Sequence, residues 1–233
     1  MEPTKPIHGP DEMRLLELLN KVQPILADAL NSMGGKIQPK PESEYLSWSA
    51  VSVNHSAGGF LYLRESGRVR ASKLLVRPAL EATFSGIAAV NDRDFLFRKA
   101  YTELCEDKKL FANGEDNKKA VELALEGLKG AFRQNCSEYP IKCETVSVWE
   151  TAKMAGLLPV YETSYRLYCQ YTHGAMRAVT GQLDETTDTA DTSTVIWCVL
   201  KMLEHLKQHS PAQVPDISGY IKNLLDLNPV KQT

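Results

Sequence analysis

Residues 11–33 read DEMRLLELLNKVQPILADALNSM, and their apolar positions establish what kind of protein this is. Within this stretch the apolar side chains recur at steps of three and four residues: Leu15, Leu18, Leu19, Val22, Ile25, Leu26 and Leu30. That spacing predicts an α-helix with one buried face, because an α-helix completes a turn about every 3.6 residues. The pair Gly34-Gly35 is expected to end the helix, since glycine commonly follows a last helical turn.

The same helical periodicity continues along most of the chain, and no clear pair of strands is visible. We expect further helices at about residues 43–65, 69–90 with a kink at Pro78, 92–106, 115–134, 146–155, 159–173, 194–208 and 217–227. The acidic, threonine-rich segment 181–193 is expected to be an exposed loop. These elements predict an all-α protein, folded as a single, mostly antiparallel bundle of about seven to nine helices.

The bulk composition is that of an ordinary globular protein: 233 residues, 43% of them hydrophobic and 24% charged, with a formal net charge of −2. A charge so near zero argues against broad coating of nucleic acid, although it is compatible with a local basic site. We expect a flexible N-terminus at residues 1–10, a helical bundle domain at 11–210, and a C-terminal helix and tail at 211–233.

No apolar run approaches the roughly 18 residues that a membrane-spanning helix needs, and residues 1–10 contain no apolar signal core. The number of cysteines is odd and no Cys-x-x-Cys pair occurs among Cys105, Cys136, Cys143, Cys169 and Cys198. This pattern is typical of reduced cysteines rather than of a zinc site or a disulfide framework. We therefore expect a cytoplasmic protein with no membrane contact, no metal and no cofactor.

The segment YRLYCQYTHG, residues 165–174, contains the two side chains best suited to catalysis, Arg166 and His173. They are seven positions apart, so on a helix they share one face. When an RNA 2′-hydroxyl attacks its own phosphate, a histidine can transfer the proton and an arginine can hold the phosphate oxygens. A structural interpretation stands beside this one, in which Arg166 pairs with Glu162 and His173 is hydrogen-bonded within the bundle.

With six residues between Arg166 and His173, this segment resembles the HEPN ribonucleases, which are helical dimers with an Arg-x(4–6)-His motif. The resemblance implies that Arg166 and His173 are catalytic, that RNA is the substrate, and that the protein is a homodimer. It also implies a regulatory protein partner, because an unrestrained ribonuclease of a toxin or defence type would harm its host.

A second candidate pair is Arg77 and Glu81, which lie among apolar positions of one predicted helix. At i and i+4 they can form an ion pair on the helix, either as an internal structural contact or as the base of a pocket. Around Gly67 a basic cluster could attract phosphate or could simply be a solvated helix start: Arg64, Arg68, Arg70, Lys73 and Arg77. His205 and His209 have metal-ligand spacing, but we interpret them as a solvated helix end.

The segments RPALEA (residues 77–82) and YTHGAMR (residues 171–177) resemble helical bacterial proteins grouped as domains of unknown function. In that group an Arg-Pro-x-x-Glu-Ala helix is followed by a helix that ends in His-Gly and then an arginine. The resemblance covers about residues 61–203 and implies that Arg77, Glu81, His173 and Arg177 form one site, without implying a reaction. Tyr165, from the aromatic side of the same helix, is expected to join Arg77, Glu81 and Arg177 in binding substrate.

Together these observations lead us to expect a HEPN-like, metal-independent RNA endonuclease with Arg166 and His173 as its catalytic residues. The alternative is a non-catalytic helical module that binds a protein or a small ligand, in which Arg77, Glu81 and His173 hold the architecture.

Overall fold

The computed structural model describes residues 9–34, 40–110, 115–134, 144–172 and 186–227, and in these residues it contains helices and no strand. The helices are α1 (Pro10–Ser32), α2 (Pro41–Glu65), α3 (Val69–Lys73), α4 (Val76–Asn91), α5 (Phe95–Leu110), α6 (Glu115–Gln134), α7 (Val148–Met154), α8 (Leu158–Val160), a π-helical turn η1 (Tyr161–Tyr165), α9 (Arg166–Thr172), α11 (Thr186–His209) and α12 (Ser218–Leu227). The expectation of an all-α bundle is confirmed.

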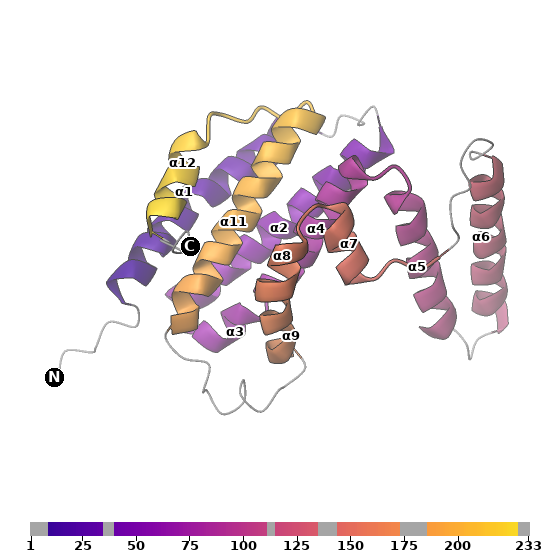
Figure 1. Cartoon of the computed structure of the whole chain (residues 1–233), viewed down its shortest axis with the longest axis horizontal. Coiled ribbons are helices and arrows are strands. Elements are labelled where there is room, and N and C mark those ends of the chain that lie inside the picture. The colour runs from indigo at the N-terminus through magenta and orange to yellow at the C-terminus, as the bar shows by residue number, and fades with distance from the viewer. Residues whose placement is uncertain (1–8, 35–39, 111–114, 135–143, 173–185, 228–233) are drawn as a thin grey trace.

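Four long helices, α1, α2, α4 and α11, pack side by side and enclose the core (Figure 1). Helix α2 runs antiparallel to α1, since Gln23 Nε2 donates to Asn54 Oδ1 at 2.8 Å while Arg64 Nη1 lies 3.3 Å from Glu12 Oε1. Helix α11 instead runs parallel to α1, because its start contacts the start of α1 and the segment after its end contacts Ser32. Before it can form α11 in this direction, the chain passes through α5 to α9 between α4 and α11.

The periodic stripe of residues 11–33 is buried as the spacing predicted. Leu15, Leu19, Val22 and Leu26 are almost fully buried against the other long helices. Pro10 occupies the first turn, where a missing N–H costs no intrahelical hydrogen bond, and acidic side chains follow it where they favour the helix N-terminus. The first helix therefore forms because its local signals and its apolar face agree.

The predicted helix at 69–90 is divided into α3 and α4, with the break at residues 74–75. Pro78 does not kink a continuous helix; it sits in the first turn of α4, where proline is tolerated because the N–H groups there have no intrahelical acceptor. The prediction of one kinked helix was therefore wrong. Gly67 precedes α3 with a φ of 73°, a left-handed conformation that glycine adopts without strain.

The predicted exposed loop at 181–193 is also wrong over the part that the structure describes, because α11 already begins at Thr186. Asp191, Thr192 and Ser193 are buried in the bundle. Residues 181–185 lie outside the described residues. Asp191 and Thr192 are accommodated inside the protein by specific partners, which a local sequence pattern does not reveal.

Helices α5 and α6 form a hairpin that projects from one side of the bundle (Figure 1). Phe95 at the start of α5 is fully buried in the core of the bundle. Val121 and Leu125 of α6 are buried within the hairpin instead. No helix in the described part of the chain is both long enough and apolar enough to cross a membrane.

Candidate functional site

Five charged side chains from four helices meet inside the bundle and form what we call the buried charge cluster: Glu12, Arg64, Lys73, Asp188 and Asp191. Arg64 Nη2 lies 3.0 Å from Asp191 Oδ2, and Arg64 Nη1 lies 3.4 Å from Asp188 Oδ1. Lys73 Nζ lies 2.9 Å from Asp188 Oδ1 and 3.2 Å from Asp191 Oδ2. Each cation thus faces at least two carboxylates, which offsets the large cost of burying charge.

Two hydroxyl groups and one aromatic ring complete the buried charge cluster. Tyr168 of α9 donates to Asp191 Oδ1 at 2.8 Å, and Thr192 Oγ1 donates to Glu12 Oε1 at 2.5 Å. The Arg64 guanidinium also lies 4.9 Å from the centre of the Phe60 ring, a cation–π distance. Through Tyr168 the cluster connects α9 to α1, α2, α3 and α11.

Burial and neighbouring charges together shift pKa values within the buried charge cluster. Burial raises the pKa of Glu12 to about 7, even though the Thr192 hydroxyl and Arg64 both favour its charged form. Burial also raises the pKa of Asp191, whereas for Lys73 the neighbouring carboxylates outweigh burial and raise the pKa. Glu12 Oε2 takes no hydrogen bond from the described residues, so this carboxyl is incompletely satisfied in its charged form.

A second group of contacts, which we call the Glu81 triad, joins Arg77, Glu81 and Tyr165. Arg77 Nε and Tyr165 Oη both donate to Glu81 Oε1, at 2.8 Å and 2.6 Å. The Arg77 guanidinium also lies 5.6 Å from the centre of the Tyr165 ring. Burial and the Glu81 carboxylate raise the pKa of Tyr165, which keeps its hydroxyl protonated as a donor.

The predicted substrate-binding residues are thus brought together in part. Arg77, Glu81 and Tyr165 are in direct contact, and the i, i+4 pairing of Arg77 with Glu81 is present. Their side chains are partly exposed rather than enclosed, at 24% for Arg77 and 37% for Glu81, so this is not the fully internal ion pair of the structural interpretation. Arg177 lies outside the described residues.

The predicted catalytic pair is described only in part. Arg166 is exposed at the start of α9 and forms no ion pair with the described residues, so the expected pairing with Glu162 is absent. Its neighbours Tyr165 and Tyr168 are buried, so α9 presents Arg166 on the side opposite its anchored face. The π-helical turn η1 directly precedes Arg166, and such turns frequently mark functional sites. His173 lies outside the described residues.

The basic cluster around Gly67 separates into two kinds of residue. Arg64 and Lys73 are buried and committed to carboxylates, so they are neither a solvated helix start nor available to a phosphate. Arg68 and Arg70 are exposed and form no ion pair with any residue that the structure describes. They belong to the end of the bundle where α3, α9 and the start of α11 lie near one another (Figure 1).

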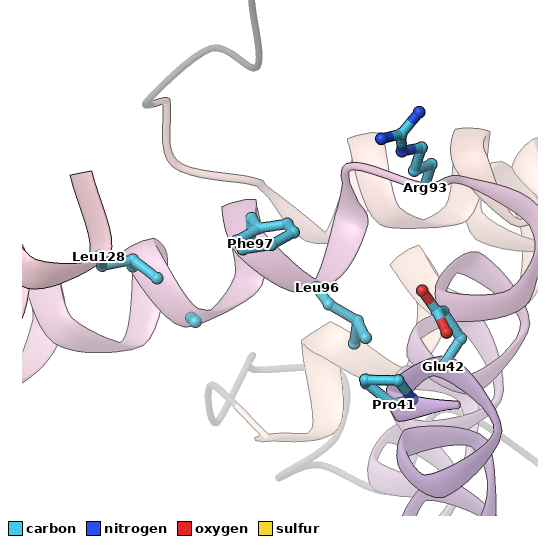
Figure 2. A pocket seen from close by; sticks show the side chains of 7 residues that line it. Pro41, Glu42, Arg93, Leu96, Phe97 and Leu128 are labelled. Carbon is cyan, nitrogen blue, oxygen red and sulfur yellow. The ribbon is translucent and has the colours of Figure 1, made fainter. Parts of the chain in front are cut away.

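Described residues line a pocket beside the α5–α6 hairpin and another beside α4. The larger, about 550 Å³, lies between α2 and the α5–α6 hairpin and is lined by Pro41, Glu42, Arg93, Leu96, Phe97, Ala100 and Leu128. Figure 2 shows Glu42 and Arg93 at one side of this apolar pocket and Leu128 at the other. The smaller, about 340 Å³, lies between α2 and α4 and includes Glu81 in its wall.

Metal-binding groups are absent from the described part of the chain, where no three side chains of histidine, cysteine, aspartate or glutamate are arranged to hold an ion. His205 and His209 stack on each other with ring centres 5.9 Å apart. Burial lowers the pKa of His205.

Sequence reasoning missed Glu12, Asp188, Asp191 and Tyr168 as members of a charged site. Glu12 was seen only as part of a helix start and Asp191 only as part of an acidic loop. One signal was present: the spacing of Asp188 and Asp191 puts both on one helical face. Their partners Arg64 and Lys73 are more than a hundred residues away in the chain, so no local pattern joins them.

Comparison with known proteins identifies a family but no activity. The model of a family of unknown function, DUF5677, matches residues 45–190, which span α2 to the first turns of α11. No curated protein and no solved structure gave a match. The resemblance to HEPN ribonucleases is not shown by these comparisons, whereas the resemblance to an all-helical family of unknown function is confirmed. The chain belongs to the DUF5677 family.

Proposed function

We propose that this protein is a HEPN-like, metal-independent RNA endonuclease that uses Arg166 and His173. The observation that carries the proposal is the state of Arg166: its guanidinium is exposed and forms no ion pair with the described residues, on a helix fixed by buried tyrosines. An arginine that serves only as a structural partner would be expected to pair with a carboxylate, and Glu162 is available nearby in the sequence.

In the proposed reaction the RNA 2′-hydroxyl attacks the adjacent phosphorus, and the bond from phosphorus to the 5′-oxygen breaks. His173 would transfer the proton between the attacking and leaving oxygens, and Arg166 would hold the charge that develops on the phosphate oxygens. The products would be a 2′,3′-cyclic phosphate and a free 5′-hydroxyl. Exposed Arg68 and Arg70 would attract the RNA backbone, and a homodimer would bring two copies of the pair to one groove.

The test is cleavage of a mixed RNA pool by purified protein with EDTA present. Arg166→Ala and His173→Ala should each abolish cleavage while circular dichroism shows unchanged helix content. Matched controls are Arg93→Ala and His209→Ala, which remove an exposed arginine and an exposed histidine from other parts of the fold. Equal cleavage by wild type and the two site variants would refute the proposal, and so would loss of cleavage in the two controls.

The alternative function, a non-catalytic module that binds a ligand or a protein, is favoured by the apolar pocket of Figure 2, whose size lies within the range of small-molecule sites. In that case His173 would hold the architecture, and His173→Ala would lower the melting temperature by several degrees without affecting any reaction. If the protein is instead a nuclease, His173→Ala should change the melting temperature little. A thermal scan of this one variant therefore separates the two functions.

A further inference from the structure

The pocket between α2 and α4 has a lining unlike that of an ordinary packing gap. Its residues are two aromatic side chains, three serines, a carboxylate, a proline and an alanine: Tyr45, Trp48, Ser49, Ser52, Pro78, Glu81, Ala82 and Ser85. Its volume is about 340 Å³, near the lower end of the range for small-molecule sites. An aromatic surface beside several hydroxyl groups and one carboxylate suits a flat ligand with polar edges.

Trp48 is the most unusual member of this pocket because it is 62% exposed. A tryptophan in solvent forgoes much of the hydrophobic stabilisation that its large ring provides when buried. Trp48 lies on α2, whose neighbours Leu46, Ser47, Ser49 and Ala50 are buried, so the helix is firmly packed and presents this ring outward. Such a ring is a platform on which a planar group can stack.

Glu81 supplies the polar edge of the pocket. Both of its hydrogen bonds, from Arg77 and from Tyr165, end on Oε1, and Oε2 takes no hydrogen bond from the described residues. The two donors hold the carboxylate in place, so Oε2 can accept a hydrogen bond from a ligand at low entropic cost. A carboxylate oxygen accepts well from an exocyclic amino group, such as N4 of cytosine, and offers nothing to a carbonyl at the same position.

The Glu81 triad also connects this pocket to the proposed catalytic helix. Tyr165, which donates to Glu81, immediately precedes Arg166 in the chain. The pocket is open to solvent at exposed Trp48, so one base can enter it while the rest of the strand stays outside.

We propose that the pocket between α2 and α4 binds a cytosine base of single-stranded RNA, with Trp48 stacked on the ring and Glu81 Oε2 accepting from its amino group. This proposal rests on the proposed function for its choice of RNA, but it concerns binding and not cleavage. It assigns Trp48, Glu81 and the pocket serines a role that is separate from the chemistry of Arg166 and His173.

The test uses fluorescence anisotropy with fluorescein-labelled 2′-O-methyl oligocytidine, which cannot be cleaved because its 2′-oxygen is blocked. Trp48→Ala should weaken binding by roughly tenfold or more, as expected for loss of one base stack, and Trp48→Phe should retain most of the affinity. The matched control is Trp149→Ala, a partly exposed tryptophan on α7 that does not line this pocket. The wild-type protein should bind oligocytidine more tightly than oligouridine. Glu81→Gln should reduce the ratio of these two affinities.

Unchanged affinity in Trp48→Ala, or an equal loss in Trp149→Ala, would overturn the proposal. Affinity for free cytidine equal to that for the strand would also overturn it, because the ligand would then not be RNA. If only the nuclease proposal is wrong, the protein should still bind the oligonucleotide in a Trp48-dependent way but should leave an unmodified RNA strand uncleaved. Circular dichroism of each variant confirms that a lost signal reflects binding and not unfolding.

Discussion

At the scale of single residues, Glu12 is a side chain whose environment differs strongly from that of a free amino acid. It is buried in α1, faces Arg64 and Thr192, and leaves Oε2 without a hydrogen bond from the described residues. Its pKa, raised by burial to about 7, means that the folded protein holds a proton that the unfolded chain releases at a lower pH.

The raised pKa of Glu12 makes the stability of the protein depend on pH. Between the ordinary glutamate pKa of 4.5 and about 7, the folded state binds more protons than the unfolded state, so this group lowers stability as pH rises. The full effect is on the order of 3 kcal/mol. Glu12→Gln should remove it, so the free energy of unfolding of the variant relative to wild type should rise between pH 5 and 7 in urea titrations. Parallel curves for the two proteins would contradict the assignment.

Asp191 provides the second prediction at this scale, because both buried cations and Tyr168 contact its carboxylate. Asp191→Asn keeps the shape but leaves Arg64 and Lys73 undercompensated, and breaking such a buried pair costs about 3–5 kcal/mol. Urea unfolding measures the loss. Asp11→Asn is the matched control, because its ion pair with Arg14 is exposed and should contribute less than about 1 kcal/mol. A loss in Asp191→Asn as small as the control's would mean that the cluster does not stabilise the fold.

At the scale of elements, α9 is a short helix that cannot be stable by itself and is positioned by what it contacts. Tyr165 and Tyr168 anchor it to α4 and α11 through the Glu81 and Asp191 carboxylates. The π-helical turn η1 immediately before it alters the helical register, so Tyr165 and Arg166 do not follow a single ideal wheel. The orientation of Arg166 therefore depends on these two tyrosine contacts.

Tyr168→Phe tests this anchoring. The change removes one hydrogen bond to a buried carboxylate and should reduce the free energy of unfolding by about 1.5–3 kcal/mol. It should also lower RNA cleavage if Arg166 acts in catalysis, because the helix that carries it is less firmly held. Tyr62→Phe, at an exposed tyrosine of α2, is the control and should leave thermal stability and cleavage unchanged.

At the scale of the whole molecule, the protein consists of a tightly packed bundle and the α5–α6 hairpin beside it (Figure 1). Helices α2 and α4 approach each other closely, and a Cβ at Gly86 would lie 2.8 Å from Ser49 Cβ. Helix α6, in contrast, packs mainly against α5 and exposes Leu123. The stability of the molecule is therefore expected to be uneven.

Native-state hydrogen exchange measures this difference. Amides in α6 should exchange through local opening at a free energy well below that of global unfolding, because few buried contacts hold the hairpin. Amides in the middle of α2 should exchange only on global unfolding. Equal protection of α6 and α2 would show that the hairpin folds as one cooperative unit with the bundle.

The sequence by itself determined the helical class, the positions of most helices and the pairing of Arg77 with Glu81. These features depend on residues only a few positions apart, whose periodicity and capping chemistry are visible locally. The predicted single helix at 69–90 was wrong only in that the structure divides it into α3 and α4. A proline in the first turn of a helix and a proline at a kink look alike in the local sequence.

Only the tertiary structure decided that Asp191 is buried, that Glu12 faces Arg64, and that Tyr165 and Arg77 meet on one oxygen of Glu81. A polar turn such as residues 186–193 resembles a loop because its side chains favour water, and it forms a helix with Asp191 buried only where distant cations compensate its charge. Long-range electrostatic partners are chosen by how whole helices pack, so they have no signature within a short stretch of sequence.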